Sequence, residues 1–317
     1  MNKIQADFTG FTDALQLGAA LEVRGGSLTY LAHNMDKVVK KFMIKTNKGK
    51  KERTIFAPSR GLKIIQQRMR SRMLLKLEMP AHVHGFVVGR STRSNASGHG
   101  GGLVVNIDLK DFFPTITPQR VYGIWHKIVG LPPRAAWIAT RLTTFENHLC
   151  QGFPTSPDIA NIAALGLDHR LVCLAAKFGF HYTRYADDLT FTAEKWGADC
   201  SWLVNAVKDI AKDEGFTVHP DKVAIMRPGR RQVVTGLVVN RNENDKATHV
   251  PRIPRRQYDK LRAMADKGPD LPPEDKMMLT GWISYVHSVQ PDKADKLKAL
   301  YETRIATPKT NWSKNNE

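Results

Sequence analysis

Tyr185-Ala186-Asp187-Asp188 lies between two short alternating segments, residues 181–185 (HYTRY) and 189–192 (LTFT). Both segments are rich in aromatic and β-branched residues, which predicts two β-strands joined by a tight turn. The turn would place two adjacent carboxylates at the tip of a hairpin. Neighbouring carboxylates make each other harder to ionise, and a divalent cation removes that repulsion. An isolated Asp-Asp pair is by itself more typical of a polar turn.

A second strand upstream carries a third carboxylate. Residues 103–109 (LVVNIDL) form an apolar run that is broken by one acid, Asp108. Strands that are buried on both faces have such runs, and an ionised carboxylate within one needs a partner. If this strand lies beside the hairpin, the three carboxylates can hold two Mg²⁺ ions ~4 Å apart, as polymerases do for in-line displacement. One ion would activate a primer hydroxyl, and the other would hold the nucleotide triphosphate and the leaving pyrophosphate.

Three segments in this order resemble the palm motifs of reverse transcriptases. They are Phe112-Phe113 after Asp108, residues 151–157 (QGFPTSP) and residues 185–188 (YADD). Two further segments, residues 95–99 (NASGH) and 234–236 (VTG), are similar to signatures of the retron reverse transcriptases. The resemblance is strong over about residues 53–240 and looser at both ends, and it indicates a reverse transcriptase of the retron type.

Helices alternate with a ββ hairpin rather than with repeated βαβ units, which predicts an α+β fold with antiparallel strands backed by helices. The resemblance implies a right-hand polymerase with fingers, an antiparallel-sheet palm and a thumb. Its expected parts are an N-terminal helical extension (1–41), fingers (42–104 and 118–150), palm (105–117 and 151–240) and thumb (250–317).

Periodicity and turn residues predict the individual elements. We expect a hairpin over 42–56 with its turn at residues 46–49, helices over 62–77, 117–129, 133–145, 157–178 and 200–214, a strand over 232–240, and short helices beyond 250.

The resemblance also implies roles for residues beside the metals. Leu109 would add its backbone carbonyl to the metal ligands Asp108, Asp187 and Asp188. The Phe113 ring would clash with a ribose 2′-OH and so select deoxynucleotides, whereas outside the motif it would be an ordinary core residue. Asp111 would approach the triphosphate, or it is an acid at a helix N-terminus.

Further residues are expected around the nucleotide. Gly152 would let the backbone approach the nascent base pair, and Gln151 would contact the nucleotide sugar or the template; the alternative is a loop and helix cap. Arg53 and Lys63 are our choices for the basic residues that clamp the triphosphate. Lys222 matches a palm lysine that protonates pyrophosphate, and a surface lysine is almost as good an account.

Other residues are candidates for RNA binding. Within the retron signatures these are Asn95, His99, Val234, Thr235 and Gly236, which would contact RNA or organise the fingers–palm junction. No second His or Cys lies at ligand spacing from His99, so a metal role there is not expected. Lys48, Lys50 and Lys51 would contact RNA phosphates.

Charge is concentrated in one part of the chain. The net charge is +18, and residues 37–76 hold 14 Lys or Arg against one acid, Glu52. Such a segment favours a polyanionic partner. Gly49 and Gly61 break it, which disfavours one continuous membrane-surface helix. No apolar run approaches the ~18 residues of a membrane span, and the first residues lack the apolar core of a signal peptide. Three dispersed cysteines are typical of reduced thiols in a cytoplasmic protein.

The sequence is therefore interpreted as an RNA-directed DNA polymerase that uses Mg²⁺, with Mn²⁺ as a substitute, and deoxynucleoside triphosphates. The resemblance implies a cognate structured non-coding RNA, priming from an RNA 2′-OH and a branched RNA–DNA product (msDNA). It also implies trimming by cellular ribonuclease H, an effector protein, a role in antiphage defence, and no membrane. The alternatives are a reverse transcriptase of group II introns or diversity-generating elements, and a non-catalytic RNA-binding scaffold on the same fold.

Overall fold

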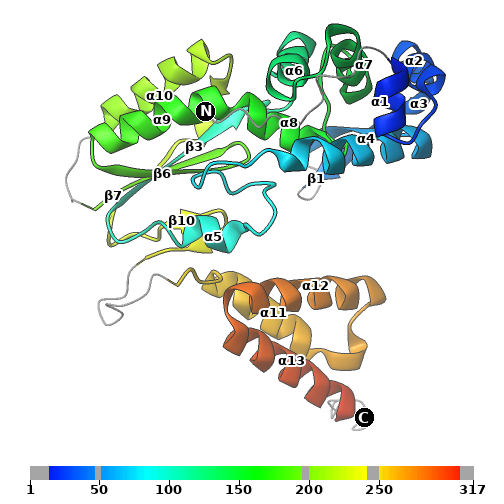
Figure 1. The fold of residues 1–317 in the computed structure, drawn as a ribbon. Helices are drawn as coiled ribbons and strands as arrows, with labels where there is room; N and C mark the ends of the chain where they lie inside the picture. Colours follow the sequence, from blue (N-terminus) through cyan, green and yellow to red (C-terminus); the bar gives the residue numbers. More distant parts are fainter. Residues whose placement is uncertain (1–13, 47–50, 195–199, 241–249, 308–317) are drawn as a thin grey trace. The chain divides into compact units, whose positions relative to one another are not determined.

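The structure is a computed structural model that describes residues 14–46, 51–194, 200–240 and 250–307 (Figure 1). The chain divides into two compact units, and each is described by itself. The first unit consists of Met1–Arg90, Val105–Phe191 and Gly197–Ala224, and the second of Ser91–Val104, Thr192–Trp196 and Ile225–Glu317.

A five-stranded sheet carries the candidate acids. Its strand order is β6-β7-β3-β8, and β9 also pairs with β3. The strands are β3 (Leu103–Lys110), β6 (Phe180–Tyr185), β7 (Asp188–Ala193), β8 (Thr217–Val218) and β9 (Ala224–Met226). β3 and β8 are antiparallel, and β3 is buried along nearly its whole length, as its apolar run predicts. Helices α9 (Leu165–Lys177) and α10 (Ser201–Asp213) cover this sheet (Figure 1).

The rest of the first unit is mainly helical. Its helices are α1 (Ala14–Ala20), α2 (Gly25–His33), α3 (Met35–Val38), α4 (Arg60–Arg72), α6 (Pro118–Gly123), α7 (Pro133–Thr143) and α8 (Ser156–Ala163). Ser59 caps α4 by accepting from the Leu62 backbone nitrogen, and α6 starts with proline after the capping Thr117. Strands β1 (Val39–Thr46) and β2 (Lys51–Pro58) form the predicted antiparallel hairpin. Of the turn predicted at 46–49, residues 47–49 lie outside the described residues.

Short elements complete this unit. They are the 3₁₀ turns η1 (Leu74–Lys76) and η3 (Pro220–Lys222), the π-helical turn η2 (Ile124–Ile128), and the two-residue strands β4 (Thr144–Phe145) and β5 (His148–Leu149).

Three helix predictions are corrected by the structure. The helix expected over 117–129 is α-helical only to Gly123 and continues as the π-helical turn η2. The helix expected over 62–77 ends at Arg72, and η1 follows it. The single helix expected over 157–178 is two helices, α8 and α9, which meet at Ala164 and are bent by 48°. The apolar pattern continues through this break, so periodicity alone could not locate it.

The second unit has its own core. It contains α5 (Thr92–Ala96), β10 (Val233–Val234), β11 (Leu237–Val238), α11 (Arg255–Asp266), η4 (Gly268–Asp270), α12 (Pro273–Val289) and α13 (Pro291–Ala306). Ala96, Val234, Leu261, Val286 and Leu297 belong to one buried cluster. The strand expected over 232–240 is wrong, because residues 233–238 form a hairpin. Thr235 and Gly236 make its turn with φ of 46° and 82°, the paired positive angles of a tight hairpin turn.

The α+β class with antiparallel pairing is confirmed. Among the described residues, no single helix is long and apolar enough to cross a membrane, and the bent pair α8–α9 meets that test by length and composition only.

Candidate active site

The turn between β6 and β7 is built as the sequence predicts. Asp188 begins β7, and Asp187 precedes it in the turn. Ala186 adopts a φ of 56°, which a non-glycine residue seldom adopts outside turns. Gly85 packs so closely against this turn that a Cβ at position 85 would collide with the backbone nitrogen of Ala186. The turn is therefore held by a neighbouring segment as well as by its own hairpin.

The structure brings the three predicted acids together. β3 lies next to β7, and the Leu109 backbone nitrogen donates to the carbonyl oxygen of Asp187 over 2.9 Å. Burial and then the Asp108 charge raise the pKa of Asp187. Burial, followed by the charges of Asp187 and Asp108, raises the pKa of Asp188 to about 6. A group of neighbouring carboxylates in which Asp108 raises the pKa of both Asp187 and Asp188 is the kind of site that a cation stabilises.

The donor set fits a hard divalent cation, which takes oxygen ligands. Among the described residues, no group of three or more His, Cys, Asp and Glu side chains is arranged as a preformed metal site. Asp108 already has a partner, because the Lys222 Nζ lies 2.6 Å from its Oδ1. The carboxylates supply suitable ligands, and Lys222 competes for one of them.

The structure agrees only in part with the predictions for the residues that follow β3. Phe112 is buried and stacks on Phe216, with ring centroids 5.5 Å apart. Phe113 is half-buried and contacts Phe112 edge to face. Asp111 is exposed with a φ of 48°, and it lies in a turn instead of at a helix N-terminus. Phe113 is therefore the ring of this pair that reaches the surface.

The loop before α8 contacts the β1–β2 hairpin. The Phe56 backbone nitrogen donates to the Gln151 carbonyl over 2.8 Å. Gly152 has a φ of 108°, and a Cβ there would collide with the Phe56 carbonyl. In the structure, glycine at this position allows a close approach to β2.

The two clamp candidates differ in their relation to the acids. Arg53 on β2 is close enough for its charge to lower the pKa of Asp187, although burial outweighs it. Lys63 is an exposed residue of α4. Lys48 and Lys50 lie outside the described residues, and Lys51 pairs through its backbone with Thr46.

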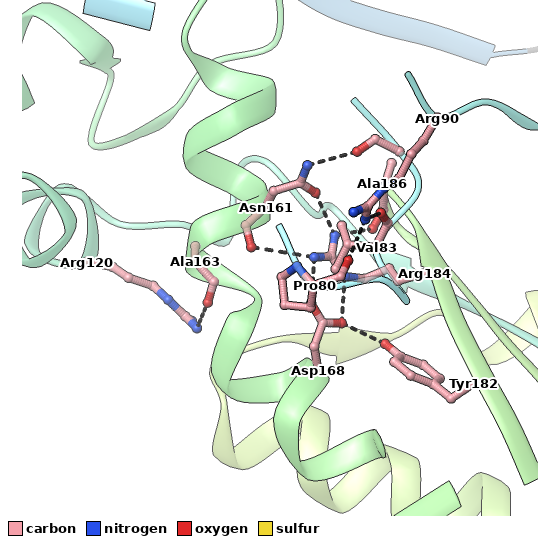
Figure 2. Close-up of polar contacts among 11 residues, drawn as sticks. Pro80, Val83, Arg90, Arg120, Asn161, Ala163, Asp168, Tyr182, Arg184 and Ala186 are labelled. Atoms are coloured by element: carbon pink, nitrogen blue, oxygen red, sulfur yellow. Dashed lines mark hydrogen bonds and ion pairs between the residues drawn. The ribbon is translucent and has the colours of Figure 1, made fainter. Parts of the chain in front are cut away.

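The sequence did not predict a buried polar network that contacts the β6–β7 turn (Figure 2). The fully buried Arg184 donates from Nε and Nη2 to the two carboxylate oxygens of Asp168, over 2.8 and 2.7 Å. Its Nη1 donates to Asn161 Oδ1 over 2.9 Å and to the Ala186 carbonyl over 3.1 Å. Tyr182 Oη also donates to Asp168, over 2.8 Å. The network ties α8, α9 and β6 to the turn that carries Asp187 and Asp188.

Comparison with known proteins identifies the family. Residues 44–261 match the family described as reverse transcriptase (RNA-dependent DNA polymerase). The chain is 38% identical to the Retron Mx162 reverse transcriptase of Myxococcus xanthus, with 81% of this chain and 60% of that protein covered. It is 33% identical to the Retron Ec86 reverse transcriptase of Escherichia coli, with 76% and 72% covered. The chain belongs to the retron reverse transcriptases. This confirms the resemblance carried by the motifs.

The chain spans about 60% of the length of the two Myxococcus xanthus relatives, Mx162 and Mx65, and 84% of the Retron Ec73 reverse transcriptase of Escherichia coli.

The two retron signatures meet in the second unit. Asn95 and His99 are both buried, and His99 Nδ1 lies 2.7 Å from Thr192 Oγ1. Val234 is also buried, Gly236 is exposed, and the Thr235 hydroxyl donates to the Thr92 carbonyl over 3.0 Å. The signatures therefore contact each other through α5 and the β10–β11 turn.

Proposed function

We propose that this chain is an RNA-directed DNA polymerase that copies part of a cognate structured non-coding RNA into DNA by two-metal-ion nucleotidyl transfer. The observation that carries the proposal is the convergence of Asp108, Asp187 and Asp188 from neighbouring strands. Membership of the retron reverse transcriptases and the net charge of +18 support it.

Asp108, Asp187 and Asp188, with the Leu109 backbone carbonyl, would hold Mg²⁺, for which Mn²⁺ is a substitute. Such a metal, when bound, would supply activation of the primer hydroxyl and stabilisation of the charge on the triphosphate. The protein holds these carboxylates in place through β3 and through the Arg184 contact to Ala186. Pre-organised ligands need little rearrangement when the substrate arrives.

Basic side chains would meet the triphosphate. Arg53 and Lys63 are the proposed clamp, and the proximity of Arg53 to Asp187 supports the first of them. Lys222 would donate a proton from its Nζ to the leaving pyrophosphate oxygen. Asp111, Gln151 and Gly152 are proposed to border the nucleotide. The Phe113 ring would exclude a ribose 2′-OH.

The subdivision into parts follows the same proposal. Fingers are assigned to 42–104 and 118–150, palm to 105–117 and 151–240, and thumb to 250–317, after an N-terminal extension over 1–41. The compact three-helix set α11–α13 supports a separate thumb.

The remaining traits are those of a retron system. Synthesis would start from a 2′-OH of the cognate RNA and give msDNA, with cellular ribonuclease H trimming the template and an effector protein acting in antiphage defence. Three free cysteines support a cytoplasmic location. RNA would bind the basic segment 37–76, which includes Lys48, Lys50 and Lys51.

Sequencing of the nucleic acid that copurifies with the protein tests this function. We expect one RNA species that is covalently joined to DNA through a 2′–5′ linkage. Linear DNA extended from ordinary 3′ ends would indicate a different class of reverse transcriptase, and bound RNA without DNA would indicate a non-catalytic scaffold.

A further inference from the structure

Phe86 has a strained backbone conformation. Its φ is 62°, in the left-handed region that bulky side chains rarely adopt. Its side chain nevertheless remains 39% exposed, so burial of the ring offsets little of this strain. A strained, exposed aromatic residue next to a catalytic turn is a candidate for a functional role.

The chain on the N-terminal side of Phe86 is fixed to β6 and to the turn. The His84 backbone nitrogen donates to the Arg184 carbonyl over 2.8 Å, and Val83 forms a parallel bridge with Arg184. The Gly85 carbonyl accepts from Asn161 Nδ2 over 2.8 Å. Gly85 also packs against Ala186, immediately before Asp187.

The chain on the C-terminal side is fixed by Arg90. Its guanidinium donates to the carbonyls of Met79, Pro80 and Val83, the last two of which are drawn in Figure 2. The segment 79–90 is thus closed on itself and joined to the catalytic turn. Gly85 packs against Ala186. Because Phe86 follows Gly85 and Asp187 follows Ala186, the position of Phe86 is fixed relative to the acids of the turn.

The Phe86 ring contacts Phe113. Their centroids are 6.1 Å apart, with the rings tilted by 58°. The Phe113 ring also contacts the ring of the buried Phe112. Phe86 also lines two cavities of about 370 and 690 Å³, so the space around its ring is not filled by core packing. If Phe86 is removed, Phe113 has room to rotate.

We propose that Phe86 is a positioning residue for sugar selection: its ring holds Phe113 against the position of the nucleotide 2′ carbon. The inference rests on the proposed polymerase function. Phe113 would meet the sugar, and Phe86 would act through Phe113. A ribonucleotide is then rejected because the Phe113 ring, backed by Phe86, does not yield to the 2′-OH.

Single-nucleotide insertion tests this role. The ratio of kcat/KM for a deoxynucleotide to that for the matching ribonucleotide is measured for the wild type, Phe113→Ala, Phe86→Ala, Phe86→Gly and Phe86→Tyr. Phe178→Ala is the matched control, because Phe178 is 48% exposed and contacts another ring, Trp202, away from the site. We expect the ratio to fall about tenfold in Phe86→Ala and Phe86→Gly, a size typical of apolar contacts in a pocket. It should stay within about twofold of the wild type in Phe86→Tyr and Phe178→Ala.

Thermal unfolding separates this role from stability. Phe86→Gly should unfold at a higher temperature than Phe86→Ala, because glycine adopts a positive φ freely. The two variants should nevertheless lose selectivity equally. A loss of selectivity that follows the unfolding temperature would mean that Phe86 is only structural.

The remaining outcomes of the insertion assay distinguish the role of Phe86 from the proposed function. If Phe113→Ala loses selectivity while Phe86→Ala keeps it, the proposed function stands and the inference on Phe86 is wrong. If Phe113→Ala keeps selectivity, the ring pair is not the selector. If the wild type inserts neither nucleotide, the proposed function fails and the inference fails with it.

Discussion

The Lys222 Nζ lies 2.6 Å from the Asp108 Oδ1, inside the group of acids that would bind metal. An ammonium group and a divalent cation compete for the same carboxylate, so we expect metal binding to weaken the contact between Lys222 and Asp108. Lys222 is therefore the counter-ion of Asp108 in this structure, and the proposed function assigns the same residue as the proton donor to pyrophosphate.

Lys222→Ala should tighten metal binding and slow synthesis. The Lys222 side chain is 41% exposed, so its ion pair is worth at most about 1 kcal/mol, and Mg²⁺ affinity should rise by no more than about fivefold. The synthesis rate should fall about a hundredfold, because a proton donor is lost. Calorimetric titration and primer extension measure the two effects, with the exposed Lys212→Ala as control. Weaker metal binding by Lys222→Ala would contradict the competition.

Metal binding should release a proton at mildly acidic pH. Burial and the neighbouring acids raise the pKa of Asp188 to about 6, so the metal-free carboxyl takes up a proton as pH falls through that value. A protonated carboxyl is a poor ligand, and the apparent Mg²⁺ affinity should therefore fall below pH of about 6 and level off above it. Calorimetry in buffers of different ionisation enthalpy counts the protons. Equal affinity on both sides of this pH, with no proton release, would show that Asp188 is not a ligand.

Asp168→Asn should destabilise the protein much more than Asp213→Asn. The side chains of Asp168 and Arg184 are 1% and 0% exposed. The substitution leaves the Arg184 charge buried and unpaired, which should lower the free energy of unfolding by about 3–5 kcal/mol. Asp213 pairs with Arg170 at the surface, where such a pair is worth about 0–1 kcal/mol. Urea denaturation measures both. Similar losses in the two variants would mean that the buried pair does not hold the first unit together.

Thr235→Val should reduce synthesis on the cognate RNA while it spares synthesis on a generic template. The change removes the hydrogen bond from Thr235 to Thr92, which joins the β10–β11 turn to α5, the helix that contains Asn95. Asn95 and His99 are buried, so a role in RNA choice would be exerted through the shape of this unit. Thr303→Val removes an exposed hydroxyl contact within α13 and serves as control. Parallel loss on both templates would make the signatures parts of the general polymerase.

General RNA binding should respond to a different change. Neutralising Lys48, Lys50 and Lys51 together should weaken binding to every RNA and flatten its salt dependence, because phosphate contacts release counterions. Filter binding at several salt concentrations measures this. An unchanged salt slope would place the RNA elsewhere on the protein.

The three acids could be predicted as site residues because the sequence around each of them indicates its secondary structure. Asp187 and Asp188 lie between two strand-forming segments, and Asp108 interrupts an apolar strand, so each required only secondary structure and one pairing. The pairing of β3 with β7 is the one long-range fact that was inferred correctly.

The buried network was not predictable in the same way. Asp168 and Arg184 are charged residues in amphipathic segments, where a charge normally faces solvent. Their burial depends on the bend at Ala164, which carries no proline signal, and on the position of α9 against β6. Phe86 was likewise hidden, since its role depends on a backbone angle and on a ring that lies 27 positions later in the sequence.

The most direct test of the account is primer extension by Asp187→Asn in the presence of Mg²⁺. This change removes the charge of one ligand and keeps its size, so the synthesis rate should fall about a thousandfold or more, while RNA binding through the basic segment is retained. The exposed Asp209→Asn should extend like the wild type. Substantial extension by a folded, RNA-binding Asp187→Asn protein would contradict the assignment of the β6–β7 turn as the catalytic centre.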